Sequence, residues 1–151
     1  MPLTFDLCTR ADLGQVQRLM DALYRHDPNV SHLRPDISRT YHELQTRPDK
    51  GLLVSFRLDG SMVGYAILIF FWSNEFGGDV IEIDELCVDS SHRGSGIASK
   101  FFAWVESKYP DRAGLSLQVA THNPGARKLY EKMGFKPSRD NHMVKLSSRT
   151  V

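Results

Sequence analysis

The stretch CVDSSHRGSGIASK, residues 87–100, joins an apolar run typical of a buried strand to a run with helical apolar spacing. Between the two runs, Arg93 is followed by three small residues, Gly94, Ser95 and Gly96. Because glycine lacks a Cβ atom, it tolerates unusual backbone angles and lets another group approach the chain closely. We therefore predict a strand, a tight turn and a helix start here.

This turn has the features of an anion site. The first amides of a helix have no partner within the helix, and the helix dipole favours negative charge beside them. We expect the amides of residues 94–98 to point outward together, with the Arg93 guanidinium suited to pyrophosphate. The stretch matches neither a Walker loop nor the three-glycine dinucleotide pattern, so a different phosphate ligand is expected.

Length and charge limit the class of protein. The chain has 151 residues, 41% of them hydrophobic, which predicts one domain, residues 1–151, with a core of its own. Its formal net charge of +1 gives no reason to expect a nucleic-acid or membrane partner. The longest apolar stretch, residues 62–72, is too short to span a bilayer, and no signal peptide precedes Leu3.

The cysteines and histidines predict no metal site. Cys8 and Cys87 fit neither a disulfide framework nor a metal spacing, which favours a reducing, cytoplasmic setting. The six histidines show no ligand spacing either, so no metal is expected. His92 and His122 flank the two segments discussed here, and each is interpreted as an exposed loop residue or as a phosphate contact.

Alternating and helical periodicities predict a mixed α/β sheet with helices on its faces. The helical runs cover residues 9–27, with Thr9 as N-cap, 37–47, 96–109 and 123–133. The strand runs cover residues 3–9, 51–58, 61–72, 80–88, 113–120 and 135–146.

Within VIEIDELCV, residues 80–88, the apolar alternation slips by one position. Apolar residues fall at 81 and 83 and then at 86 and 88, which a regular strand cannot accommodate on one face. A β-bulge at Asp84 and Glu85 repairs the pattern. It leaves both carboxylates on the face opposite the apolar one, together with Glu82 and Cys87.

The same neighbourhood is acidic. Between Asn74 and Ser91 there is no lysine or arginine, which predicts a local field that attracts cations. The alternative is an ordinary solvated strand face and loop. The acidic residues are Glu75, Asp79, Glu82, Asp84, Glu85 and Asp89.

A second motif, NPGARKLYEKMGF, occupies residues 123–135. Asn123 is a good N-cap, Pro124 suits the first helical position, and Gly134 suits a helix end. Tyr130 is either a packing residue of the apolar stripe or a catalytic acid. The stripe consists of Ala126, Leu129, Tyr130 and Met133.

An RGSGIA turn that opens a helix, followed by this second motif, resembles the GNAT superfamily of acyl-CoA-dependent N-acetyltransferases. The resemblance is specific over residues 81–135 and compatible only in element order over residues 1–80. It implies a largely antiparallel central sheet that is splayed at a β-bulge, with helices on both faces. It also implies acetyl-CoA as co-substrate.

The resemblance implies roles for individual residues. Asn123 would contact the cofactor, and Tyr130 would protonate the departing thiolate. Backbone groups of the strand would pair with pantetheine, at Leu86, Cys87 and Val88. The turn would hold the CoA pyrophosphate through Arg93, Gly94, Ser95, Gly96, Ile97 and Ala98.

The remaining roles follow from the chemistry of amine acetylation. A primary amine is mostly ammonium near pH 7, so it must lose a proton before it attacks. Glu85 is the first choice as base, Asp84 the second, and Glu82 a base acting through water. A backbone N–H at Cys87 or Val88 would stabilise the oxyanion. We expect direct transfer, because nothing in the sequence lowers the pKa of Cys87 for a nucleophilic role.

The sequence constrains the amine that accepts the acetyl group less than it constrains the cofactor. FFWSNEFGGDVIEIDELCV, residues 70–88, is similar to diamine and aminoglycoside acetyltransferases, which favours a small cationic amine. Phe71, Trp72 and Phe76 are expected to wall the amine site or to lie in the core. The alternatives are a protein lysine or N-terminal acetyltransferase and a non-catalytic acyl-CoA-binding module. Many relatives pair as dimers, so a homodimer stays open.

Overall fold

The structure is a computed structural model that describes residues 2–148. It contains two compact units, one ending at Gln118 and one beginning at Val119, and each is described by itself. The first unit holds the sheet, three of the helices and the predicted turn. The second unit holds the helix of the second motif.

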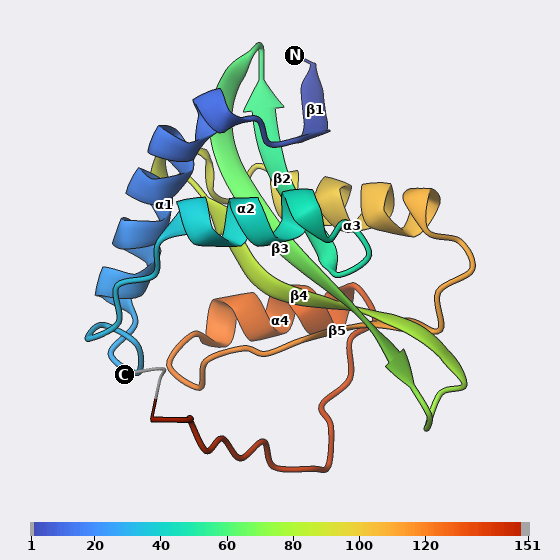
Figure 1. Ribbon diagram of the computed structural model, residues 1–151. Helices are drawn as coiled ribbons and strands as arrows, with labels where there is room; N and C mark the ends of the chain where they lie inside the picture. The colour runs from blue at the N-terminus through green and yellow to red at the C-terminus, as the bar shows by residue number, and fades with distance from the viewer. Residues whose placement is uncertain (1, 149–151) are drawn as a thin grey trace. The chain divides into compact units, whose positions relative to one another are not determined.

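The first unit is built on a five-stranded sheet with the order β1-β2-β3-β4-β5 (Figure 1). Neighbouring strands from β1 to β4 are antiparallel, and β5 is parallel to β4. This confirms the predicted mixed, largely antiparallel sheet. The strands are β1 (Leu3–Leu7), β2 (Gly51–Leu58), β3 (Ser61–Ser73), β4 (Gly78–Val88) and β5 (Gly114–Leu117).

Helices cover both faces of this sheet. α1 (Leu13–His26) and α2 (Ile37–Thr46) lie on one face and α3 (Ile97–Lys108) on the other (Figure 1). The predicted N-cap Thr9 precedes a short 3-10 turn, Arg10–Asp12, that leads into α1. The Asp12 carboxylate accepts a hydrogen bond from the Thr9 N–H at 2.8 Å. None of the helices within residues 2–148 has the length and apolar character that crossing a membrane requires.

Each face of the sheet has its own core. Under α1 and α2, Val16 and Met20 are fully buried against Tyr65 and Ile67 of β3. On the α3 face, the ring of Phe101 lies 4.7 Å from that of Phe56, measured between centroids, and Phe5 joins the same cluster. Burying large side chains on both faces is the main source of stability for such a layered fold.

The predicted bulge is present in β4. Ile67 of β3 lies opposite Glu85, and the next residue, Leu68, lies opposite Ile83, so Asp84 is the extra residue. The bulge reverses the side-chain alternation. Glu85 and Cys87 therefore share the face covered by α1 and α2, because Cys87 lies opposite Tyr65 of that core.

In the second unit, α4 (Pro124–Lys132) has the predicted ends. The Asn123 side chain accepts a hydrogen bond from the Ala126 N–H at 3.1 Å, as an N-cap does. Gly134 adopts a φ of 98°, the left-handed conformation that ends helices and favours glycine. The predicted apolar stripe, which includes Tyr130, is the less exposed side of this helix.

The prediction of a strand over residues 135–146 is wrong. The segment has no regular secondary structure, and Met143 is 91% exposed. A strand needs a neighbour to satisfy its backbone groups, and residues 119–148 contain no strand that could pair with this segment. Alternating apolar residues at 144 and 146 therefore did not suffice to form one.

The contact between β3 and β4 leaves no room at Gly64. A Cβ atom there would lie 2.5 Å from the Cys87 carbonyl oxygen and 2.7 Å from Cδ2 of Phe56. Gly64→Ala should therefore lower the free energy of unfolding by about 1–3 kcal/mol, measured by urea denaturation. Gly114→Ala, where a Cβ atom would meet nothing within 4 Å, is the control and should stay within about 1 kcal/mol of wild type. Equal stability of the two variants would contradict the packing.

Candidate active site

Glu85 is held between two tyrosines. The Tyr24 hydroxyl, from α1, donates to Oε2 of Glu85 at 2.5 Å. The Tyr65 hydroxyl, from β3, donates to Oε1 at 2.9 Å. The carboxylate is half-buried under α1, so the interpretation of Glu85 as part of a solvated strand face is wrong.

This environment changes the acid–base properties of all three groups. Burial raises the pKa of Glu85, the two hydroxyl hydrogen bonds oppose that rise, and Asp84 adds to it. Burial and the neighbouring Glu85 also raise the pKa of Tyr24 and of Tyr65, so both hydroxyls stay protonated and donate at neutral pH. A carboxylate with a raised pKa is a better base than an exposed one.

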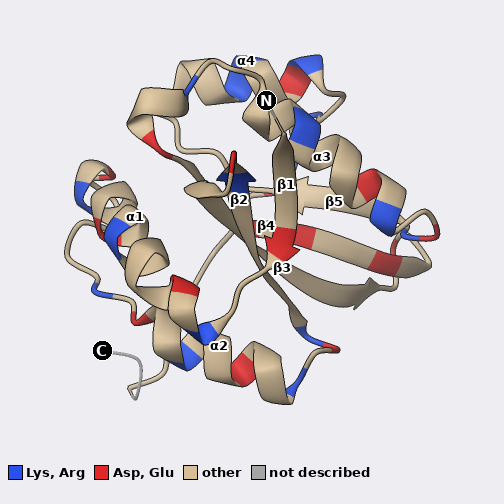
Figure 2. Cartoon of the chain, turned by 90° about the horizontal axis from the view of Figure 1, so that it is seen from above, with Lys and Arg blue, Asp and Glu red and all other residues tan. Residues whose placement is uncertain are grey.

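The other two carboxylates lie on the same strand. Asp84, at the bulge, has a more exposed side chain, yet the surrounding protein and then Glu82 raise its pKa. Glu82 accepts a hydrogen bond from the Ser116 hydroxyl of β5. Acidic residues, those of β4 among them, are drawn in red in Figure 2. Within residues 2–148, no three metal-ligating side chains are grouped as a metal site.

Beyond the bulge, no strand within residues 2–148 pairs with the outer edge of β4, which we call the free edge. Its parallel pairing with β5 ends where Ile83 lies opposite Leu117, although β4 continues to Val88. The Asp89 N–H bonds to Val63 of β3, so by the alternation of an antiparallel ladder Cys87 also bonds toward β3. The backbone groups of Leu86 and Val88 consequently point to the free edge.

The predicted turn follows this edge directly. Arg93 donates from Nε to the Val88 carbonyl at 3.1 Å, which ties the turn to the end of β4. Gly94 and Gly96 have φ values of 78° and 83°, so both adopt the left-handed conformation that glycine favours. The Ser95 hydroxyl donates to the His92 carbonyl at 2.5 Å.

The turn is open on its outer side. A Cβ atom at Gly94 or Gly96 would meet nothing within 4 Å, so there is space for a ligand beside the backbone. Gly96 is the N-cap of α3, whose first residues are the buried Ile97 and the half-buried Ala98. The amides at this helix start suit an anion such as a phosphate group, and the Arg93 guanidinium supplies positive charge beside them.

Cys87 has the properties of a packing residue. Its side chain is 5% exposed, and its sulfur lies 3.8 Å from the Leu19 carbonyl oxygen of α1. Burial raises the pKa of its thiol to about 11, so little thiolate exists at neutral pH. This fits direct transfer rather than an acyl-enzyme.

Tyr130 and Asn123 belong to the second unit. Burial raises the pKa of Tyr130, which keeps its hydroxyl protonated at neutral pH, as a general acid requires. Its ring lies against Phe135, with 6.0 Å between ring centroids. The Asn123 side-chain oxygen is engaged in capping α4.

The aromatic residues near the β3–β4 turn are not core residues. Phe71 is 46% exposed, Trp72 67% and Phe76 65%. The core interpretation of these three residues is therefore wrong. Their role as walls of an amine site stays a prediction.

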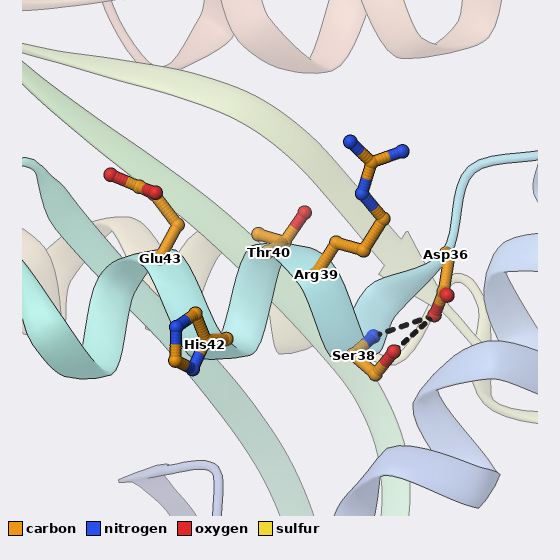
Figure 3. Close-up of a pocket in the computed structure, with 6 residues that line it drawn as sticks. All are labelled: Asp36, Ser38, Arg39, Thr40, His42 and Glu43. Atoms are coloured by element: carbon orange, nitrogen blue, oxygen red, sulfur yellow. Dashed lines mark hydrogen bonds between the residues drawn. The ribbon is translucent and has the colours of Figure 1, made fainter.

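An open hollow lies on the surface of α2 and its N-cap (Figure 3). There the Asp36 carboxylate accepts hydrogen bonds from the Ser38 N–H at 2.9 Å and the Ser38 hydroxyl at 2.6 Å. Every lining residue comes from this one helix and its cap, and none from β4 or the turn. The lining residues are Asp36, Ser38, Arg39, Thr40, His42 and Glu43.

Sequence reasoning missed the two tyrosines that bind Glu85. A signal for Tyr24 existed, because it follows Val16 and Met20 at intervals of four and so continues the buried stripe of α1. Tyr65 lies within a continuous apolar run and carries no distinguishing pattern.

Comparison with known proteins agrees with this geometry. The model of the acetyltransferase (GNAT) family matches residues 16–135, which include parts of both units. No curated protein gives a significant match.

Solved structures share the fold at low identity. A transcriptional regulator from Bacillus halodurans C-125 has a TM-score of 0.78 and 21% identity, covering 96% of this chain and 100% of its own. A possible acetyltransferase from Clostridium difficile 630 has a TM-score of 0.75 and 18% identity, covering 96% and 97%. The ribosomal-protein-alanine N-acetyltransferase from Brucella melitensis biovar Abortus 2308 has a TM-score of 0.74 and 24% identity, covering 97% and 100%.

The mixed sheet, its bulged fourth strand and the open glycine turn define an acetyltransferase fold. Since the family model matches most of the chain, the protein belongs to the GNAT acetyltransferase family, whose members transfer acyl groups from acetyl-CoA.

The turn offers a test of CoA binding. Gly96→Ala places an L-residue at a φ of 83°, which costs about 1–2 kcal/mol of stability and shifts the turn. Gly60→Ala is a matched control, because Gly60 has a φ of 82° and equally open surroundings in the β2–β3 turn. Calorimetric titration with acetyl-CoA should show weakened binding for Gly96→Ala only. Equal affinity of the two variants would exclude this turn as the site.

Proposed function

We propose that the protein transfers the acetyl group of acetyl-CoA to a primary amine of a small molecule with a second positive charge, such as a diamine, polyamine or aminoglycoside. The observation that carries the proposal is the position of Glu85. It lies one residue past the bulge, held by two tyrosines, on the strand whose edge opens beyond that bulge. Glu82 and Asp84 add negative charge on the same strand.

The first step is removal of a proton from the ammonium group of the acceptor. In the proposal, Glu85 takes this proton, and its raised pKa makes it suited to the task. Asp84 and Glu82 attract the second positive charge, because carboxylates on one strand reinforce each other's field. The exposed Asp84 side chain is the more accessible of the two.

The remaining steps use backbone and tyrosine groups. Acetyl-CoA would supply an activated acetyl group: the neutral amine forms the new C–N bond, the C–S bond breaks with departure of the CoA thiolate, and the proton that the nitrogen loses on becoming an amide passes to solvent. The Val88 N–H at the free edge is suited to stabilise the developing oxyanion, whereas the Cys87 N–H points to β3. Tyr130 is assigned the proton that the departing thiolate receives, on the basis of the second sequence motif.

Acetylation of a protein lysine or N-terminus is the alternative acceptor class. One structural neighbour is named as a ribosomal-protein-alanine N-acetyltransferase, but an identity of 24% supports a shared fold only. A panel of amines and peptides, scored by thiol release from acetyl-CoA, separates the classes. Release with peptides alone would favour the protein acceptor, and absence of thiol release with every amine and peptide would favour a binding module.

Dicationic amines should react faster than monoamines of equal length. The reason is the carboxylate cluster, which holds the charge that does not react. The advantage in kcat/KM should shrink as salt is raised, because exposed charges are screened over about 8 Å at physiological ionic strength. Equal kcat/KM for both amines at low salt would contradict the proposed acceptor.

Glu85→Gln should lower kcat by about 10²–10⁴-fold, the usual contribution of a general base. The rise of rate with pH, which reports deprotonation of the base, should disappear or move to a different pH. Glu75→Gln, which removes the same charge from an exposed residue of the β3–β4 turn, is the control and should keep the wild-type dependence of rate on pH. An unchanged profile in folded Glu85→Gln would remove Glu85 as the base.

Tyr130→Phe keeps the ring and its contact with Phe135 but removes the acidic proton. Turnover should fall by about 10²–10⁴-fold if proton donation limits the rate, while the urea midpoint stays near that of wild type. Wild-type turnover in this variant would show that Tyr130 is a packing residue and not the general acid.

A further inference from the structure

We propose that Tyr24 and Tyr65 are positioning residues that hold the Glu85 carboxylate in one orientation and set the pH at which it accepts a proton. The catalytic part of this inference rests on the proposed function. The structural part concerns three side chains of the first unit and stands without it.

The geometry fixes both oxygens of the carboxylate. Tyr24 donates to Oε2 at 2.5 Å and Tyr65 donates to Oε1 at 2.9 Å, so a rotation of the carboxylate breaks both bonds. Each carboxylate oxygen has two lone pairs, so each can still accept one more hydrogen. The pair of tyrosines therefore orients the base without using up its capacity.

The two donors come from different layers of the fold. Tyr65 is fully buried in β3, two residues from Ile67, which lies opposite Glu85. Tyr24 is half-buried near the end of α1 and continues the stripe of Val16 and Met20. Hence one donor comes from the sheet and the other from the helix that covers it.

Several titratable groups act on Glu85 or on the residues that contact it. Asp84, its neighbour on β4, favours the protonated form of the carboxyl, and the two hydroxyls favour the carboxylate. Asp27, just past α1, acts on Tyr24. Cys87 of β4 interacts electrostatically with Glu85 and also with Arg93, which follows β4 in the glycine turn.

The sign of the expected effect follows from these groups. Tyr24→Phe keeps the ring and most of the burial but removes a hydrogen bond that stabilises the carboxylate, so the pKa of Glu85 should rise further. Loss of a hydrogen bond to a charged group changes the ionisation equilibrium on the order of tenfold. The rise of rate with pH should therefore move to higher pH, with the plateau at high pH less affected.

The test combines a direct titration with kinetics. Carbon-13 NMR of the Glu85 side-chain carboxyl gives its titration midpoint in wild type, Tyr24→Phe and Tyr65→Phe. The matched control is Tyr41→Phe, because Tyr41 is an α2 tyrosine whose hydroxyl accepts from the Gln45 side chain at 2.7 Å and does not contact Glu85. The pH dependence of kcat/KM is then measured on the same four proteins by thiol release.

The expected result is a midpoint moved to higher pH in Tyr24→Phe and Tyr65→Phe and unmoved in Tyr41→Phe, with the kinetic profile following the midpoint. Unmoved midpoints in folded Tyr24→Phe and Tyr65→Phe, the two residues that clamp Glu85, would overturn the inference. Moved midpoints without a kinetic shift would overturn its catalytic part and remove Glu85 as the base. The clamp itself would stand in that case.

Discussion

Asp84 adds one residue to β4 opposite the step from Ile67 to Leu68, and the alternation of side chains along the strand reverses there. Before the bulge, Ile83 belongs to the α3 face. After it, Glu85 lies under α1, where a regular strand would have turned it toward α3. The bulge thereby brings a carboxylate against two tyrosine hydroxyls and coincides with the end of the pairing between β4 and β5.

Placing a carboxylate under α1 has an energetic cost. A half-buried charge loses hydration, and hydrogen bonds must offset that loss if the ionised form is to persist. The hydroxyls of Tyr24 and Tyr65 provide two such bonds, and the remaining desolvation leaves the pKa of Glu85 raised. The same arrangement that costs stability thus makes Glu85 a stronger base than an exposed carboxylate would be.

Local patterns in the sequence predicted the features that depend on local geometry. The slipped alternation in residues 80–88 predicted the bulge, and two glycines behind Arg93 predicted a tight turn, in which both glycines have positive φ. The pairing of Tyr24 with Glu85, 61 residues apart, depends on how α1 packs across the sheet and left no local pattern. The expected final strand failed for a related reason, because alternation shows that a segment suits a strand but not that a neighbour exists.

The central claim is that, beyond the bulge, the N–H groups of Leu86 and Val88 point to the edge of β4 where we propose that acetyl-CoA binds, while Cys87 bonds to β3. Amide hydrogen exchange of these three residues, with and without saturating acetyl-CoA, tests it most directly. The prediction is that the Leu86 and Val88 amides exchange quickly in the free protein and become protected on binding, whereas the Cys87 amide is protected in both. Unchanged exchange at Leu86 and Val88 in the bound protein would contradict the claim.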